Sequence, residues 1–461
     1  MNEPVAVTHI VAGRVVEGTE VVHPNRGDQR SFATPKLAVD SLVWPRHTPG
    51  PAFDLPVGEI IDFLVATGAL LRSDASPLDD ALRSAVQLDP TRASVLEHGY
   101  RKLPEHFDRA SLEFQVQHDL GGAEVIDGWC TVHPPGSNGC SVRAFPPRLV
   151  HVLAGNGPGV AATTIVQAAL TKGLHLLKLP SNDLFTATAI LRSMVAIDPE
   201  HPVVRSFSAV YWKGGDEAVE PYVFRPQWFD KLVAWGGEAA LRSALRYAGP
   251  GLELVSFDPK VSISLIGREA FESEATLTTV AELAVADATV SNQESCAASR
   301  YQFVEGNVEE SDRFCTLLVG RLTAFRPHAT ATPRPTPAEI RDEVEVLRLL
   351  EPDYRVWGSY DGDGLVVRSM APVDFHPTHR TVNVVPVDSL GSATRFVTVA
   401  TQTVGIYPPA RSIELRDSLA RAGAQRLVPL GRASLWRPGL PHDAMYPLRR
   451  LVRWIVDQET I

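Results

Sequence analysis

One cysteine stands among residues that favour a chemical role. Cys296 lies in "TVSNQESCAASR" (289–300), between polar and small residues, at the end of a helix predicted over residues 276–291. A structural thiol normally has apolar neighbours, whereas a reactive thiol needs an accessible, polar position near hydrogen-bond donors. Cys296 is therefore a candidate nucleophile. No papain-type signature surrounds it, so a cysteine–histidine pair of that kind is unsupported.

Asn156 stands in a Gly-rich stretch, "LAGNGPGVAATT" (153–164), between a predicted strand and a predicted helix. The glycines suggest a phosphate-binding loop, but the third Gly of G-x-G-x-x-G would fall at Val160 and no P-loop sequence follows. A tight turn before a helix explains the glycines equally well. It does not explain a polar amide just beyond the carboxyl end of a strand.

Two further stretches have the same strand-to-turn arrangement. Lys178 ends the apolar run "LHLLKLP" (174–180), and Gly236 and Gly237 precede the helix predicted from residue 238. At the carboxyl end of a parallel strand, a lysine can meet the phosphate or ribose of a ligand. Paired glycines let a backbone approach a ligand closely. The alternatives are a solvated lysine and simple turn formation.

His376 and His379 in "DFHPTHR" have a spacing that suggests metal binding. Pro377 between them disfavours a helix, so a shared ligand face is not assured and we expect no metal site.

The elements that position these residues form a repeating pattern from residue 148 onward. Short apolar runs alternate with helical periodicity, which predicts a parallel sheet with crossover helices. Before it, periodicity at 56–71 and 78–98 predicts a helical N-terminal region. The Pro-rich stretch 326–340 predicts a surface loop, with Thr336, Pro337 and Glu339 beginning the next helix. The predicted strands are 148–155, 174–180, 203–212, 231–237, 252–257 and 260–267.

Composition excludes several classes of protein. A chain of 461 residues, 44% hydrophobic, can form two or three domains with sizeable cores. Its charge of −10, with scattered Lys and Arg, argues against nucleic acid as a partner. The sequence shows neither a membrane-spanning apolar run nor a signal peptide, so we expect a cytoplasmic protein. Reduced thiols are expected, because no C-x-x-C pair occurs among Cys130, Cys140, Cys296 and Cys315.

Taken in order, these stretches resemble the aldehyde dehydrogenase superfamily, and within it the acyl-CoA reductase family of bacterial bioluminescence, the LuxC type. The resemblance covers about residues 100–461 and is carried by "LAGNGPG", "LLKLPSND", "AWGGEAALR", "FDPKVS", "NQESCAASR" and "HDAMYPLRRLVRWI". It implies an α/β fold with a helical N-terminal region and Rossmann-like cofactor domain (1–258) and an α/β catalytic domain (259–440). A C-terminal segment (441–461) would pack back on the cofactor domain or on a neighbouring subunit of a dimer or tetramer.

The resemblance also implies roles for individual residues. Cys296 would take up the acyl group as a thioester, and Asn156 would donate, with the Cys296 backbone N–H, to the oxyanion formed during attack. Such donors act where charge develops in the transition state. Lys178, Ser181 and the turn at Gly236 and Gly237 would hold a nicotinamide dinucleotide.

Two departures from the superfamily pattern predict the type of reaction. Ser256 occupies the position of the Glu that activates water in hydrolytic aldehyde dehydrogenases, and Glu253 would point to the opposite face of its strand. We therefore expect an acyl-CoA or acyl-protein thioester to acylate Cys296, and hydride to release an aldehyde. Ser181 replaces the Glu that contacts the ribose hydroxyls, which removes repulsion toward a 2′-phosphate that Lys178 can meet. NADPH is the expected cofactor, with NADH as the alternative.

Two other departures leave the substrate undefined. Asp258 introduces a charge where the reductase family has Gly, and Ala444 replaces the Gly of "H-D-G". The alternatives to a reductase are a hydrolytic aldehyde dehydrogenase and a non-catalytic acyl-binding subunit of a larger complex.

Overall fold

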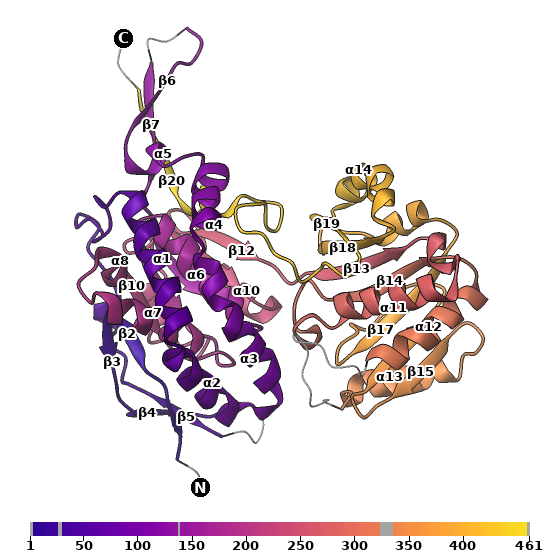
Figure 1. Cartoon of the computed structure of the whole chain (residues 1–461). Coiled ribbons are helices and arrows are strands. Elements are labelled where there is room, and N and C mark those ends of the chain that lie inside the picture. The colour runs from indigo at the N-terminus through magenta and orange to yellow at the C-terminus, as the bar shows by residue number, and fades with distance from the viewer. Residues whose placement is uncertain (1–2, 26–29, 137–138, 323–334, 459–461) are drawn as a thin grey trace. The chain divides into compact units, whose positions relative to one another are not determined.

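The computed structural model of the chain, shown in Figure 1, describes residues 3–25, 30–136, 139–322 and 335–458. These residues form two compact units. The first consists of Met1–Asp258 together with Arg437–Ile461, and the second is Pro259–Trp436. The sequence-based division placed boundaries after residues 258 and 440; the structure divides the chain after Asp258 and after Trp436.

The first unit is built on a seven-stranded sheet in the order β12-β11-β8-β9-β10-β2-β3. Its strands from β12 to β10 are parallel, and β2 and β3 continue it antiparallel. The apolar runs read from the sequence correspond to buried strands because helices cover both faces of such a sheet. The strands are β2 (His9–Val11), β3 (Arg14–Val16), β8 (Arg148–Val152), β9 (Leu174–Lys178), β10 (Phe207–Val210), β11 (Lys231–Trp235) and β12 (Glu253–Phe257).

Helices connect these parallel strands, as the alternating pattern predicts. One predicted strand was partly wrong: the run 203–212 begins with a short helix, because Pro202 starts a turn before the strand itself. The connecting helices are α6 (Pro158–Leu170), α7 (Thr186–Ile197), α8 (Pro202–Arg205), α9 (Glu220–Val223) and α10 (Glu238–Leu245).

The prediction of a helical N-terminal region was wrong for residues 5–23 and 32–34, which contain short strands instead of helices. Ala12 and Gly13 both have positive φ, 47° and 77°, and connect β2 to β3 as a tight hairpin. A further sheet joins β1 (Val5–Ala6), β5 (Phe32–Thr34) and β4 (Val21–His23). Helices begin later, with α1 (Val57–Ser73), α2 (Ser76–Leu88), α3 (Ala93–Lys102), α4 (Arg109–Phe114) and α5 (Glu124–Asp127).

The C-terminal segment completes the first unit. Strand β20 (Arg453–Gln458) pairs antiparallel with β7 (Cys140–Phe145), which pairs with β6 (Cys130–Val132), and the three strands project from the unit as an arm (Figure 1). Helix α15 (Pro447–Leu451) is capped by the buried Asp119 carboxylate, whose Oδ1 accepts from the Leu448 N–H at 3.0 Å. Burial raises the pKa of Asp119 to about 6, against the effect of these backbone donors.

The second unit is also a seven-stranded sheet, in the order β15-β16-β17-β14-β13-β18-β19. All neighbouring pairs are parallel except β15 with β16. Helices α11 (Glu274–Ala288) and α12 (Val308–Leu322) pack on it through Val280, Ala284 and Phe314. The strands are β13 (Val261–Ile266), β14 (Ser299–Glu305), β15 (Arg355–Ser359), β16 (Gly364–Arg368), β17 (Thr381–Val387), β18 (Thr401–Tyr407) and β19 (Arg426–Pro429).

Two smaller helices complete this unit, α13 (Ala338–Arg348) and α14 (Ser412–Ala422). The predicted helix start near residue 336 is close to the observed one, since α13 begins directly after Pro337. Most of the Pro-rich loop, residues 326–334, lies outside the described residues.

No helix in the described part of the chain is long and apolar enough to span a membrane. Within the same residues, no group of three or more His, Cys, Asp and Glu side chains is arranged to hold a metal ion.

Candidate active-site residues

Asn156 lies in the loop between β8 and α6, just beyond the carboxyl end of the strand. The neighbouring Gly155 carbonyl accepts from Arg92 at 2.9 Å and from the Asn182 amide at 3.1 Å. A Cβ at position 155 would come within 2.2 Å of Asn182 Oδ1 and 3.0 Å of the Asp183 backbone nitrogen, so the loop requires glycine there. Asn156 Oδ1 itself is buried and accepts no hydrogen bond from the described residues.

Lys178 is the last residue of β9 and is 9% exposed. Its ammonium lies 5.4 Å from the centroid of the Trp212 ring, over the ring face. Burial lowers the pKa of Lys178, and the negative charge of Glu220 opposes that shift. Ser181 follows three residues later in a partly exposed turn.

Gly236 and Gly237 connect β11 to α10. Gly236 has φ +149°, a conformation that L residues rarely adopt, so the turn requires glycine at this position. Gly237 has φ −71° and a Cβ there would meet nothing within 4 Å. The fold therefore does not require glycine at position 237. The absence of a side chain there leaves the backbone accessible at the start of α10.

Cys296 lies in a half-buried turn of the second unit, directly before β14. The predicted helix ends at Ala288 rather than at residue 291, because Ser291, Asn292 and Gln293 all take left-handed conformations with φ of 49°, 52° and 66°. Each such residue costs roughly 1–2 kcal/mol, and strain of this kind clusters at functional sites. The backbone before the thiol is therefore held in an unfavourable form by its surroundings.

Hydrogen bonds fix the turn on both sides of the thiol. The Cys296 carbonyl accepts from Ser262 Oγ at 2.7 Å, and that hydroxyl in turn accepts from the Thr403 N–H. The Ala297 N–H donates to Ser295 Oγ, and the Ala298 N–H to the Ser295 carbonyl. Strands β13 and β18 thus hold the turn in place.

Arg300 is a buried cation beside this turn. Its guanidinium donates to the carbonyls of Gln293 and Pro377, which connects the left-handed segment to the loop that contains the two histidines. Burial lowers the pKa of Arg300 to about 10, and electrostatic interactions with Tyr301 and Cys296 oppose that shift. A cation close to a cysteine favours the thiolate, which is the reactive form.

A second guanidinium, that of Arg426, is held by the Leu435 carbonyl at 2.7 Å and the Thr403 hydroxyl at 3.0 Å. Burial lowers the pKa of Arg426, and interactions with Cys296 and Asp287 oppose the shift. Sequence reasoning missed Arg300 and Arg426. Arg300 was visible as a charge in a stretch that becomes a buried strand, whereas Arg426 is 130 residues from the thiol and gave no signal.

The loop that contains His376 and His379 contacts Arg300. The Pro377 carbonyl between His376 and His379 accepts from Arg300, and His379 Nδ1 contacts the Thr378 hydroxyl at 2.9 Å. Burial and the charge of Arg300 lower the pKa of His376 to about 4. This loop supports the turn around Cys296.

Ser256 and Glu253, on which the expectation of a non-hydrolytic reaction rests, lie in the first unit. Ser256 lies in β12, paired with Ala234 of β11. Glu253 in the same strand forms ion pairs with Lys231 at 2.9 Å and Arg450 at 2.6 Å, which occupy its carboxylate. Asp258, the last residue of the unit's first segment, is exposed.

The "HDAM" stretch forms a tight turn in which the backbone N–H and carbonyl of His442 bond those of Met445. Asp443 and Ala444 have φ of 47° and 61°, the conformation of a type I′ turn. This positive φ explains why the resembled family has Gly at position 444, because glycine adopts it without strain. Ala444 adopts it with strain. The His442 ring packs against the stacked rings of Trp235 and Phe257, next to Gly236.

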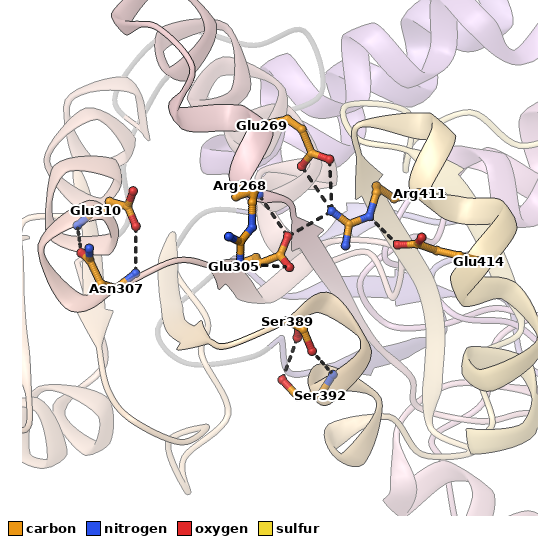
Figure 2. Close-up of polar contacts among 9 residues, drawn as sticks. All are labelled: Arg268, Glu269, Glu305, Asn307, Glu310, Ser389, Ser392, Arg411 and Glu414. Carbon is orange, nitrogen blue, oxygen red and sulfur yellow. Dashed lines mark hydrogen bonds and ion pairs between the residues drawn. The ribbon is translucent and has the colours of Figure 1, made fainter.

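A polar cavity of about 730 Å³ lies in the second unit, at the end of its sheet opposite to Cys296. Glu269, Asn307 and Asp388 are among the residues that line it. Figure 2 shows the ion pairs beside it, in which Arg411 joins Glu269 and Glu305. Strand β14 starts after the Cys296 turn and ends at Glu305, so its seven residues, about 20 Å, separate the cavity from the nucleophile. None of the predicted site residues lines it.

The structure therefore gathers Asn156, Lys178, Ser181, Gly236 and Gly237 at the carboxyl ends of strands in the first unit. Cys296 lies in the second unit, and its pairing with Asn156 stays a prediction.

Solved structures with this fold are aldehyde dehydrogenases. Lactaldehyde dehydrogenase of Escherichia coli superposes with a TM-score of 0.70 at 14% identity, covering 98% of this chain and 99% of the other. An aldehyde dehydrogenase of Mycobacterium tuberculosis complexed with NAD+ gives 0.71 at 14% identity, covering 100% and 99%. The predicted aldehyde dehydrogenase-like α/β fold is thus confirmed.

Sequence relatives define the family more narrowly. A long-chain acyl-protein thioester reductase of Photorhabdus laumondii is 31% identical over 74% of this chain and 69% of its own length. Its counterpart in Vibrio harveyi is 27% identical over 87% and 83%. The model of the family described as acyl-CoA reductase (LuxC) matches residues 52–454. The chain belongs to the LuxC family of acyl-CoA reductases.

Proposed function

We propose that this protein is an acyl-thioester reductase that forms an aldehyde through an acyl-enzyme on Cys296. The thiolate attacks the thioester carbonyl, the carrier thiol leaves, and hydride from a nicotinamide cofactor then releases the aldehyde and restores the thiol. The names of the relatives, long-chain acyl-protein thioester reductases, support a long-chain acyl group on a protein carrier as substrate. Acyl-CoA is the second carrier to test.

The observation that carries the proposal is the environment of Cys296. The half-buried thiol stands in a strained turn and interacts electrostatically with the guanidinium of the buried Arg300 and with that of the partly buried Arg426. Among the described residues, both guanidiniums donate to backbone carbonyls, and that of Arg426 also donates to the Thr403 hydroxyl. Their charge is therefore available to favour a thiolate.

The absence of a base favours reduction over hydrolysis. Ser256 stands where hydrolytic relatives carry a carboxylate, and Glu253 is engaged by Lys231 and Arg450. A serine hydroxyl does not accept a proton from water near neutral pH, so the acyl-enzyme should persist until hydride or a thiol reaches it.

Asn156 fits the role of oxyanion donor. Hydrogen bonds from Arg92 and Asn182 to the Gly155 carbonyl hold the loop that contains it. The NH2 group of the Asn156 amide is the part of the side chain that would donate to the oxyanion.

The residues at the ends of β8, β9 and β11 fit a nicotinamide dinucleotide. Lys178 offers a cation, Ser181 carries no charge that would repel a 2′-phosphate, and Gly237 leaves a helix N-terminus open. When bound, the cofactor supplies the hydride. NADPH is the proposed donor, with NADH as a weaker alternative.

The direct test is mass spectrometry after incubation with a long-chain acyl-CoA or acyl carrier protein in the absence of nucleotide. One acyl group should appear on Cys296 and disappear when NADPH is added, with appearance of the aldehyde. Cys296→Ala should abolish both, while Cys130→Ala should change neither. Normal turnover by Cys296→Ala, or steady release of free acid without a thiol acceptor, would contradict the proposal.

A further inference from the structure

Lys178 belongs to a small buried cluster at the carboxyl ends of β9 and β10. It pairs in register with Val210, two residues before Trp212, whose ring carries the lysine ammonium on its face. Trp212 is 2% exposed and Lys178 is 9% exposed. The Lys178 ammonium is therefore positioned by the ring of a fully buried tryptophan, Trp212.

Glu220, at the start of α9, holds that ring. Its Oε1 accepts from the Trp212 indole N–H at 3.2 Å and from the Gly215 N–H at 3.0 Å. Its Oε2 is buried and accepts no hydrogen bond from the described residues. Burial and the charge of Glu220 also raise the pKa of Tyr247. Glu220 is 3% exposed.

The charge of Glu220 acts on Lys178, whose protonated form it favours. The same charge reduces the positive potential that Lys178 presents to a ligand, because the field of a carboxylate offsets that of an ammonium. A ligand with a 2′-phosphate is affected more than one with a 2′-hydroxyl, because only the phosphate is charged.

We propose that Glu220 is a positioning and specificity-determining residue for the nucleotide. It fixes Trp212, and so the Lys178 ammonium, and its charge weakens the preference for a 2′-phosphate that Ser181 and Lys178 create. This inference rests on the proposed nucleotide site. It would allow a chain that lacks an acidic residue at 181 to bind NADH as well as NADPH.

The test is the dissociation constant of each nucleotide, measured by titration calorimetry on the full-length protein without acyl substrate. Glu220→Gln keeps an acceptor for the Trp212 N–H and removes the charge. It should tighten NADPH binding by about three- to tenfold and change NADH binding by less than about twofold. Glu217→Gln, which removes an exposed charge three residues away, should change neither.

A double-variant cycle tests whether the effect passes through Lys178. In a Lys178→Met background, Glu220→Gln should no longer change the ratio of the two constants. An unchanged ratio in the Glu220→Gln single variant would overturn the proposal, as would the same gain in both backgrounds. If Glu220→Gln does not fold, Trp212→Phe replaces it, because this variant keeps a ring and loses the N–H. It should change the dissociation constant of NADPH more than that of NADH. Equal changes in the two constants would overturn the proposal. Acylation of Cys296 needs no nucleotide, so failure here leaves the proposed reaction standing.

Discussion

At the scale of single residues, the proposed reactivity of Cys296 depends on a neighbouring cation, Arg300, that does not itself react. Arg300 lies four residues after Cys296, and its guanidinium donates to the Gln293 carbonyl before the turn and to the Pro377 carbonyl of the neighbouring loop. A residue with this geometry both shapes the turn and favours the thiolate, and the two effects can be separated because one depends on charge and the other on contacts.

Removing the charge of Arg300 should lower the reactivity of the thiol. In Arg300→Met, alkylation of Cys296 by iodoacetamide at pH 7.5 should slow by about tenfold, and the midpoint of its pH profile should move upward, because a nearby cation favours the thiolate. Arg300→Lys should lie between. Arg313→Met, which removes a surface cation paired with Glu274, serves as control. An unmoved pH midpoint in Arg300→Met would assign the residue a purely structural role.

Ala444 gives a prediction about stability. Ala444 has φ +61° in the turn after Asp443, where an L side chain is strained and glycine is not. Ala444→Gly should therefore stabilise the first unit by about 1 kcal/mol, less the additional chain entropy of glycine in the unfolded state. Chemical denaturation followed by tryptophan fluorescence would measure it. A loss of stability would show that the methyl group makes a contact worth more than the strain.

At the scale of elements, strands in the first unit carry buried histidines that must stay neutral. His9 in β2 accepts the Tyr211 N–H on Nε2 at 3.1 Å, and burial with the charge of His23 lowers the pKa of His9 to about 4. Nε2 of His151 in β8 lies 3.3 Å from Nδ1 of His175 in β9. Burial lowers the pKa of His151 to about 3.

These histidines predict acid sensitivity of the first unit. Their ordinary pKa of 6.5 applies in the unfolded chain, which therefore binds more protons than the folded state below pH 6.5. Stability should fall as the pH drops from 6.5 toward 4, by about 1.4 kcal/mol per pH unit for each such histidine. Urea denaturation at several pH values would show the slope, and His151→Leu should reduce it. A flat profile over this range would contradict the prediction.

The same elements show what could and could not be predicted from the sequence. The strands between residues 148 and 267 were predictable, apart from the start of the run 203–212, because burial on both faces leaves continuous apolar runs such as "LHLLK". The N-terminal strands were not, because two- and three-residue strands give no period. The loops after β8, β9 and β11 followed from residue type and order, whereas the role of Cys296 as the nucleophile stays a prediction. Arg92, Glu220 and Arg426 act through contacts distant in sequence, which no local pattern encodes.

At the scale of the whole molecule, the arm of β6, β7 and β20 presents apolar side chains that nothing in the described chain covers. Trp129, Val132, Trp454 and Val456 are between 40% and 55% exposed. Exposed apolar residues that gather on one element indicate an interaction surface, which agrees with the predicted dimer or tetramer.

Charging the arm should therefore prevent self-association. Trp454→Glu combined with Val456→Glu should shift the protein to the monomer mass in size-exclusion chromatography with light scattering. Ile413→Glu, at an apolar position on α14 that is more exposed (73%), should leave the assembly unchanged. If the wild-type protein is already monomeric, the arm has another partner and the predicted oligomer is wrong.

The return of the chain to the first unit has a consequence for truncated chains. Residues 259–436 form a unit that needs no residue after Trp436, whereas the first unit needs Leu448, whose N–H bonds the buried Asp119, and the strand that pairs with β7. A chain truncated after residue 436 should therefore resist protease in its second unit and remain cleavable in its first.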